Sequence, residues 1–251
     1  MKNKQHRELA VCGFEAVRAL AACHPERIQR LFFNKDRARF FGDICRSLAA
    51  SRRVYRLVET DDELEKLCQS VHHQGVVAMI DFPQIPRLEQ EQLETWALTG
   101  EQIVALDRVG NANNLGAIVR SAAFFGICNL IISDEDEQAD VTTSTWRVAQ
   151  GGMEYVNIWR VSSMSWLSGQ CAGRITRIGA DHRARNRLRD LPSLAPSGTA
   201  VVVILGNEET GLSAAVKDAC DHLVRIPGSG DIESLNVAQA ASLFLYELAA
   251  R

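Results

Sequence analysis

The segment VVVILGNEETGLSAAV, residues Val201–Val216, decides how the second half of the chain is expected to fold. An apolar run ends at Gly206, four residues separate it from Gly211, and a helix-like segment follows. A nucleotide-hydrolysing P-loop has this order, but Lys and Ser/Thr come next in it. Here those two positions are Leu212 and Ser213. The loop therefore offers no cation to a metal-bound triphosphate, and we expect it to hold a different ligand.

The composition is that of a globular protein. The chain has 251 residues, of which 46% are hydrophobic and 24% charged, and this length suits more than one domain. No apolar run approaches the ~18 residues that cross a bilayer. The first residues lack the uninterrupted apolar core of a secretory signal. We therefore expect no membrane association and a cytoplasmic location.

Cysteines and charges narrow the possibilities further. The seven cysteines occur singly with no C-x-x-C pair, so neither a disulfide framework nor a metal site is predicted. The net charge of -3 conceals a basic segment, Met1–Arg56, with 13 Lys and Arg against five Asp and Glu. A second basic run, RARNRLR, spans Arg183–Arg189. Such runs can neutralise phosphates, although each alone is more typical of an ordinary solvated surface than of a nucleic-acid site.

The order of helix-like and strand-like segments predicts α/β architecture in two domains. In residues 1–81, helical spacing at GFEAVRALAA alternates with short apolar runs such as IQRLFF and GVVAMI, which predicts an α/β sandwich. Thr60 and Glu63 are spaced as a capping box. Residues 82–100 contain two prolines and are expected to be a linker with a short helix within 90–96. In residues 101–251, continuous apolar strands such as AVVVIL predict a parallel sheet buried on both faces.

Three polar loops leave strands of this predicted sheet, at the edge where ligands collect in open parallel sheets. They are DRVGNANNLGAIVR, residues 107–120, LGNEETG, residues 205–211, and IPGSGDIESLN, residues 226–236. None contains G-x-G-x-x-G, so a usual dinucleotide site is not predicted. The loops offer backbone amides and the side chains of Asn114, Arg120, Asn207, Glu208, Ser234 and Asn236. Such groups suit a neutral heterocycle, an amino-acid moiety and a single phosphodiester.

The segments NNLGAIVR, LGNEETGLS and IPGSGDIESLNVAQA resemble, in order and spacing, the three motifs of the SpoU/TrmH family of RNA ribose 2′-O-methyltransferases, in the SPOUT class. HHQGVVAMI, residues 72–80, resembles a stretch of the ribosomal-protein-like RNA-binding domain that many members carry. The resemblance implies a deep trefoil knot in the C-terminal domain and an N-terminal RNA-binding domain. It also implies a homodimer that transfers methyl groups from S-adenosylmethionine to rRNA or tRNA without a metal.

The resemblance also assigns roles to residues. It places cofactor contacts at Leu205, Gly206, Asn207, Gly211, Ile226, Leu235 and Asn236. It places catalysis at Arg120, surrounded by Asn114, Glu208, Ser234 and Asn236. An arginine side chain is a poor base because it stays protonated. We therefore expect Arg120 to bind a phosphate and to stabilise the developing alkoxide.

Simpler structural roles compete with these assignments. Arg120 could form a surface ion pair, Glu208 could be a helix N-terminal charge, and Ser234 and Asn236 could cap the last helix. We expect His72 and His73 to be structural, and Trp146, Trp159 and Trp166 to pack or to form a subunit interface.

Two positions depart from the family pattern: Gly228 stands where Met is common and Ala238 where Ser is common. They favour an alternative, an RNA-binding or assembly factor that retains the fold without turnover. A nucleotide-hydrolysing P-loop protein is disfavoured by Leu212.

Overall fold

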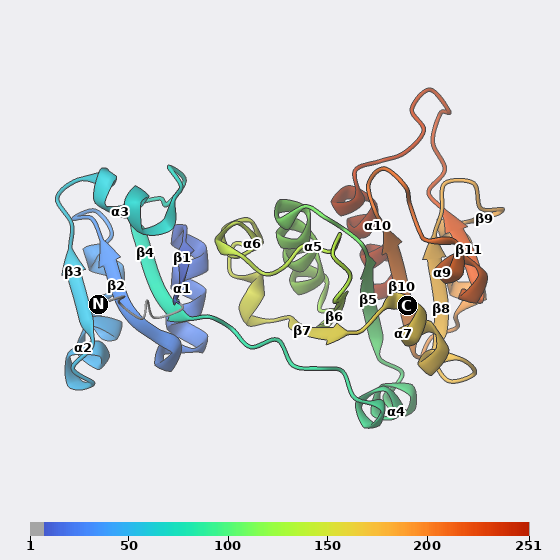
Figure 1. Ribbon diagram of the computed structural model, residues 1–251, viewed down its shortest axis with the longest axis horizontal. Helices are drawn as coiled ribbons and strands as arrows, with labels where there is room; N and C mark the ends of the chain where they lie inside the picture. Colours follow the sequence, from blue (N-terminus) through green and yellow to red (C-terminus); the bar gives the residue numbers. More distant parts are fainter. Residues whose placement is uncertain (1–7, 251) are drawn as a thin grey trace. The chain divides into compact units, whose positions relative to one another are not determined.

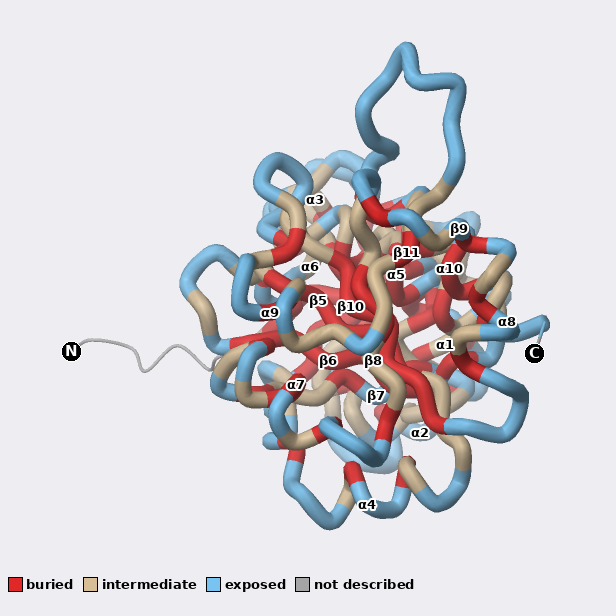
Figure 2. Tube along the Cα trace, turned by 90° about the vertical axis from the view of Figure 1, so that its right-hand side faces the viewer, coloured by how far each residue is buried: buried red, intermediate tan, exposed pale blue. Residues whose placement is uncertain are grey.

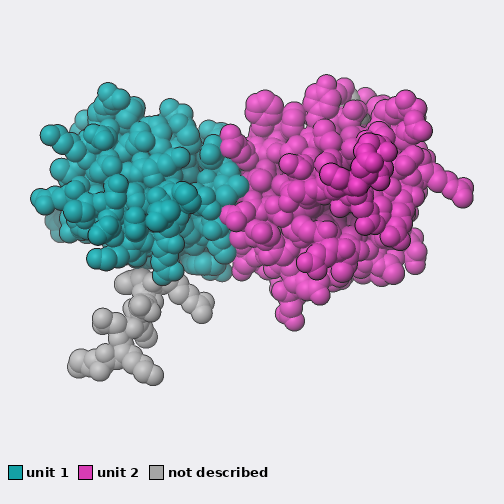
Figure 3. Space-filling model, turned by 90° about the horizontal axis from the view of Figure 1, so that it is seen from above, with its two compact units in different colours: residues 1–84, 141–155 teal, residues 85–140, 156–251 magenta. Residues whose placement is uncertain are grey.

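The computed structural model describes residues 8–250 and contains two compact α/β units, coloured separately in Figure 3. Unit 1 comprises residues up to 84 together with 141–155, and unit 2 comprises residues 85–140 and 156 onward. Lys2, Lys4 and Arg7 of the basic N-terminal segment lie outside the described residues. The domain limits 1–81, 82–100 and 101–251 stay a prediction.

Unit 1 is built on a four-stranded sheet in the order β1-β4-β2-β3 (Figure 1). Its strands are β1 (Glu8–Cys12), β2 (Ile28–Phe33), β3 (Val54–Leu57) and β4 (Val76–Asp81), and β4 runs antiparallel to β1 and β2. Its helices are α1 (Phe14–Cys23), η1 (Pro25–Arg27), η2 (Ala38–Phe40), α2 (Gly42–Ala50), α3 (Asp61–Cys68), α6 (Thr143–Ala149) and η3 (Gly152–Glu154). The predicted α/β sandwich is therefore present.

Alternation along the strands separates the two faces of this sheet. On β2, Phe32 packs in one cluster with Leu64 of α3, whereas the neighbouring residues Leu31 and Phe33 face the other way. Thr60 is the N-cap residue of α3, but its side chain makes no capping hydrogen bond. The predicted capping box is wrong because the carboxylate of Glu63 pairs with the Arg56 guanidinium instead.

Unit 2 is built on a seven-stranded parallel sheet in the order β7-β6-β5-β10-β8-β11-β9. Its strands are β5 (Gln102–Asp107), β6 (Asn129–Ser133), β7 (Asn157–Val161), β8 (Thr176–Ala180), β9 (Asn186–Arg187), β10 (Val201–Gly206) and β11 (His222–Arg225). Its helices are α4 (Gln90–Thr99), α5 (Ala112–Phe125), α7 (Met164–Cys171), η4 (Leu188–Asp190), α8 (Leu191–Leu194), α9 (Ala214–Ala219) and α10 (Val237–Ala249).

The central strands β5 and β10 are buried on both faces, as predicted (Figure 2). Ile103 of β5 joins a core cluster with side chains of α4, α7 and α9, and the alternate residue Val104 is equally buried on the opposite face. The expected short helix within 90–96 is α4, whose Leu93 and Trp96 belong to the same core cluster. The segment 85–100 is therefore packed into unit 2.

The tryptophan side chains and His73 pack as expected, whereas His72 is exposed. Trp146 is buried in unit 1, and Trp159 donates its indole N–H to Asn129 Oδ1 at 3.0 Å. His73 is buried, and its Nδ1 accepts a hydrogen bond from the Gly75 amide at 3.0 Å. In the part of the chain that the structure describes, no helix combines the length and apolar character needed to cross a membrane.

Candidate active site

Side chains from the three predicted loops meet at the carboxyl ends of the central strands. Asn114 Nδ2 donates a hydrogen bond to Glu208 Oε1 at 2.5 Å. Asn236 Nδ2 donates to Asn114 Oδ1 at 3.2 Å. We call Asn114, Glu208 and Asn236 the carboxamide cluster. The cluster joins all three loops, so the convergence that the sequence predicts is present.

The first loop is anchored by a residue that the sequence analysis missed. Asp107 ends β5 and is only 1% exposed, and its Oδ2 accepts a hydrogen bond from the Ser213 amide at 2.7 Å. Burial by itself would lower the pKa of the neighbouring Arg108 guanidinium. The hydrogen bond from Arg108 to Asp107 outweighs this effect and raises that pKa above its usual value. A charged residue that directly follows a fully apolar run was the available signal for such an anchor.

The second loop is a tight turn that requires glycine. The backbones of Asn207 and Gly211 exchange hydrogen bonds of 3.2 and 3.0 Å. A Cβ on Gly206 would stand 2.3 Å from backbone atoms of Gly211 and Leu212, so no side chain fits there. Gly211 has φ +69°, which disfavours other residues. The Asn207 side chain is occupied inside the protein, because its Nδ2 donates to the Arg108 carbonyl at 2.9 Å.

The third loop extends away from unit 2, and residues 227–236 are exposed throughout (Figure 2). Leu235, an expected cofactor residue, is 47% exposed. Glu233 holds this loop to the basic run, with Oε1 lying 3.1 Å from His182 Nε2 and 3.4 Å from Arg183 Nη2. Asn236 caps α10 by accepting from the Ala238 amide at 2.9 Å, so the capping alternative is correct for Asn236. Ser234 is not the cap of α10 and makes no described contact with the carboxamide cluster.

Arg120 lies exposed on α5. No hydrogen bond or ion pair within residues 8–250 engages its guanidinium, so the surface ion-pair alternative is wrong for this part of the chain. Arg120 lies six positions after Asn114 on α5, a rise of about 9 Å along the helix. The described contacts therefore bring Asn114, Glu208 and Asn236 together, and they do not include Arg120.

The helix-charge alternative is wrong for Glu208. Helix α9 begins at Ala214, six residues later, and its first turn contains no acidic residue. The Glu208 carboxylate is held by Asn114 instead. This arrangement places a negative charge beside two carboxamides at the edge of the sheet.

The loops suit a ligand that is recognised through backbone groups. A Cβ built on Gly211, Gly228 or Gly230 would meet no heavy atom within 4 Å, so another molecule can approach the main chain closely there. The exposed apolar side chain of Leu235 is available to a heterocycle. Among the described residues, no group of three or more His, Cys, Asp or Glu side chains is arranged to hold a metal ion.

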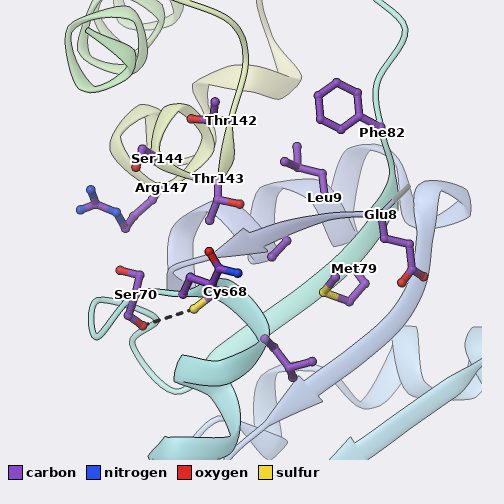
Figure 4. A pocket seen from close by; sticks show the side chains of 13 residues that line it. Glu8, Leu9, Cys68, Ser70, Met79, Phe82, Thr142, Thr143, Ser144 and Arg147 are labelled. Atoms are coloured by element: carbon purple, nitrogen blue, oxygen red, sulfur yellow. Dashed lines mark hydrogen bonds between the residues drawn. The ribbon is translucent and has the colours of Figure 1, made fainter. Parts of the chain in front are cut away.

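A separate cavity of about 470 Å³ lies in unit 1, beside β1, the end of α3 and α6 (Figure 4). Cys68 lines it and donates its thiol to the Ser70 carbonyl at 3.3 Å. A hydrogen bond with Cys12 lowers the pKa of the Cys68 thiol below its usual value. None of the predicted site residues lines this cavity.

Comparisons with known proteins identify the family of this chain. A model of the SpoU rRNA Methylase family matches residues 101–246, and a model described as RNA 2′-O ribose methyltransferase substrate binding matches residues 10–86. The chain is 32% identical over 237 residues to the 23S rRNA (guanosine-2′-O-)-methyltransferase RlmB of Acinetobacter baylyi, with 94% of each chain covered. The protein of the same name from Coxiella burnetii is 31% identical over 252 residues, covering 95% of this chain and 94% of that protein.

Solved structures share the fold. The S-adenosylmethionine-bound rRNA methyltransferase from Sinorhizobium meliloti superposes with a TM-score of 0.76 at 24% identity, covering 96% of this chain and 86% of that chain. The SpoU methyltransferase AviRb from Streptomyces viridochromogenes, in complex with the same cofactor, superposes with a TM-score of 0.75 at 24% identity, covering 100% of this chain and 93% of that chain.

Proposed function

Because this chain belongs to the SpoU family of RNA methyltransferases, we propose that it methylates the ribose 2′-hydroxyl of a guanosine in 23S rRNA. The general activity, transfer of a methyl group from S-adenosylmethionine to an RNA ribose, follows from family membership, and the predicted family is confirmed. The choice of 23S rRNA and guanosine is supported by relatives of that specificity that align with both units. The observation that carries the proposal is the carboxamide cluster, because it joins all three family motifs in one place.

We assign cofactor binding to the backbone of the second and third loops. Leu205, Gly206, Ile226 and Leu235 would hold S-adenosylmethionine, which supplies an electrophilic methyl group when bound. Gly211 and Asn207 keep the second loop in its tight turn. We further propose that the C-terminal segment forms the trefoil knot expected of this family.

The polar side chains are assigned to the RNA. Asn236 orients Asn114, and Asn114 in turn holds one carboxylate oxygen of Glu208. The second oxygen, Oε2, accepts no hydrogen bond from the described residues, and we assign it to the ribose 2′-hydroxyl. Arg120 binds the adjacent phosphate and stabilises the negative charge that develops on the 2′-oxygen. This electrostatic stabilisation of the transition state is largest where water is excluded from the site. Ser234 is assigned to the same polar surface, once the third loop is closed over its ligands.

We also propose that the chain works as a homodimer in the cytoplasm. Helices α5 and α10 pack together through the Ser121 and Ser242 hydroxyls, 2.8 Å apart. Their outer surface presents Phe124, Leu243 and Tyr246, which are 82%, 39% and 57% exposed. Exposed apolar patches of this kind are typical of protein interfaces. Arg120 lies on the same helix as Phe124, so a partner subunit at this surface would stand close to the catalytic arginine.

The direct test is methyl transfer with the purified chain. Tritiated S-adenosylmethionine is incubated with protein-free 23S rRNA, 16S rRNA or bulk tRNA, and the modified site is mapped by primer extension. We expect label in 23S rRNA at a guanosine ribose. Label only in tRNA or 16S rRNA would contradict the proposed substrate. Calorimetric binding of S-adenosylmethionine without transfer to any of these RNAs would favour the assembly-factor alternative.

A further inference from the structure

Two aromatic rings and two guanidinium groups gather at one end of the unit 1 sheet, apart from the methyl-transfer residues. Strands β1 and β2 run opposite to β4, so the residues that follow β1 and β2 meet those that precede β4. Backbone hydrogen bonds mark this junction, from Gly13 N to the His73 carbonyl at 3.2 Å and from Asn34 N to the Gly75 carbonyl at 3.0 Å.

The side chains at this junction form a layered group that we call the aromatic–arginine cluster: Phe14, Arg37, Arg39 and Phe40. The rings of Phe14 and Phe40 meet edge to face with centroids 4.8 Å apart. The Arg37 guanidinium lies 4.4 Å from the Phe14 centroid, and that of Arg39 lies 4.7 Å from the Phe40 centroid. Two adjoining rings at the surface of unit 1 are therefore flanked by one guanidinium group on each side.

Gln74 holds this cluster in place. Its Oε1 accepts from the Phe14 amide at 2.8 Å, and its carbonyl accepts from Arg37 Nε at 2.9 Å. Its own backbone is left-handed, with φ +52°. Residues other than glycine keep such a conformation only where their surroundings enforce it, and they concentrate at functional sites. The cluster is thus fixed before any ligand arrives.

The cluster is exposed and carries uncompensated positive charge. Phe40 is 44% exposed although it is a large apolar residue. The surrounding segment, residues 34–41, contains Lys35, Arg37 and Arg39 against the single carboxylate of Asp36. Within the described part of the chain, no ion pair neutralises any of these three cations. An exposed ring flanked by cations that have no ion-pair partner among the described residues is suited to stacking a base and pairing with its phosphates.

We propose that the aromatic–arginine cluster binds an unpaired nucleotide of the RNA substrate. The base stacks on Phe40 and on the Arg39 guanidinium, and Lys35 and Arg37 pair with the flanking phosphates. This assignment rests on the proposed function, because it takes unit 1 to be the module that holds the RNA. The partner is single-stranded RNA rather than a duplex, because bases within a helix do not present their faces to a ring.

The test measures binding of the full chain to a short fluorescein-labelled oligouridine by anisotropy. Phe40→Ala should raise the dissociation constant about tenfold, which is the expected effect of losing one stacking contact. Phe40→Trp should keep it within about twofold because the stacking surface remains. Lys35→Ala should weaken binding and also lower its dependence on salt, because Lys35 is assigned to a phosphate. Tyr55→Ala is the matched control, since Tyr55 is a 45% exposed aromatic on β3 of the same unit.

Several results would overturn the assignment. The assignment fails if the wild-type chain does not bind oligouridine, or if Phe40→Ala binds it as tightly as the wild type. It also fails if Phe40→Trp and Phe40→Ala lose the same amount of affinity. A loss of affinity in the control Tyr55→Ala as large as that in Phe40→Ala would also overturn the assignment. Methyl transfer to 23S rRNA, measured in parallel, separates the two proposals. If the wild-type chain binds oligouridine through Phe40 but transfers no methyl group, the cluster stands and the proposed function fails. If Phe40→Ala binds and methylates like an active wild-type chain, the cluster fails and the proposed function stands.

Discussion

Asn114 donates its side-chain amide to Glu208 across 94 residues of sequence, and this hydrogen bond joins the first two loops of unit 2. Asn236 extends the same network to the third loop. Side-chain networks of this kind orient their members only when each partner is present. The chemistry of the site is therefore expected to respond sharply to single substitutions in these loops, while the sheet beneath them does not.

Arg120→Ala should lower kcat/KM for methyl transfer by about 10²–10³-fold, the usual effect of removing one group that stabilises transition-state charge. The melting temperature should not change, because Arg120 is exposed and engages no described residue. Arg174→Ala, at another exposed arginine of unit 2, is the control and should stay active. Full activity of Arg120→Ala would refute its catalytic role.

Substitutions at Glu208 separate its charge from its position. Glu208→Gln keeps a side-chain oxygen that can accept the hydrogen bond from Asn114 and removes only the negative charge. We expect it to lower kcat/KM about tenfold. Glu208→Ala also releases Asn114 and should cost about 100-fold. Calorimetry should find S-adenosylmethionine affinity little changed in both variants. Equal activity of the two variants would mean that the hydrogen bond to Asn114 has no part in the reaction.

Gly206→Ala should destabilise unit 2 by about 2 kcal/mol and abolish cofactor binding, because the new methyl group meets backbone that cannot move aside. Gly169→Ala, on α7 and outside the three loops, is the matched control, since its Cβ enters open space and its φ is not positive. Urea denaturation and calorimetry with S-adenosylmethionine check both variants. A stable Gly206→Ala protein that binds the cofactor would contradict this account of the second loop.

Phe124→Glu should convert the proposed dimer into a monomer, because it places a charge in the exposed apolar surface of α5 and α10. Leu98→Glu changes a residue of similar exposure on α4 and should leave the dimer intact. Sedimentation velocity at micromolar concentration distinguishes the two states. A monomeric wild-type protein under these conditions would contradict the dimer.

Asp221 should contribute stability that depends on pH. Hydrogen bonds from Arg177 lower the pKa of Asp221 below its usual value, and the Nε–Oδ2 distance is 3.0 Å. A carboxyl group with a lowered folded pKa stabilises the protein above its unfolded pKa of about 4, and this stability is lost as pH falls through the folded pKa. Because the side chain is 36% exposed, Asp221→Asn should cost only about 1 kcal/mol at neutral pH. Urea denaturation should find that the difference shrinks in acid, and a constant difference would exclude this ion pair as its cause.

The strands and loops of both units could be predicted because their signals are local. The apolar run Val201–Leu205, bounded by Gly206, defines a buried strand and its turn within a few residues. The same applies to the helix that begins after Asn111, which caps it through the Asn113 amide. The predicted capping box at Thr60 failed because the partner that Glu63 takes, Arg56, lies on a neighbouring strand. The spacing of Thr60 and Glu63 does not indicate that a side chain on another element competes for the Glu63 carboxylate.

The sequence by itself determined the α/β class, the parallel sheet, the three polar loops and the family, since each depends on residue order within short windows. Only the tertiary structure decided that Asp107 anchors Ser213, that Asn114 holds Glu208, and that Gln74 joins Phe14 to Arg37. The physical reason is that a hydrogen bond forms over about 3 Å whatever the separation along the chain. Which distant groups come within that range is settled by strand order and register, and these emerge only when the whole sheet has packed.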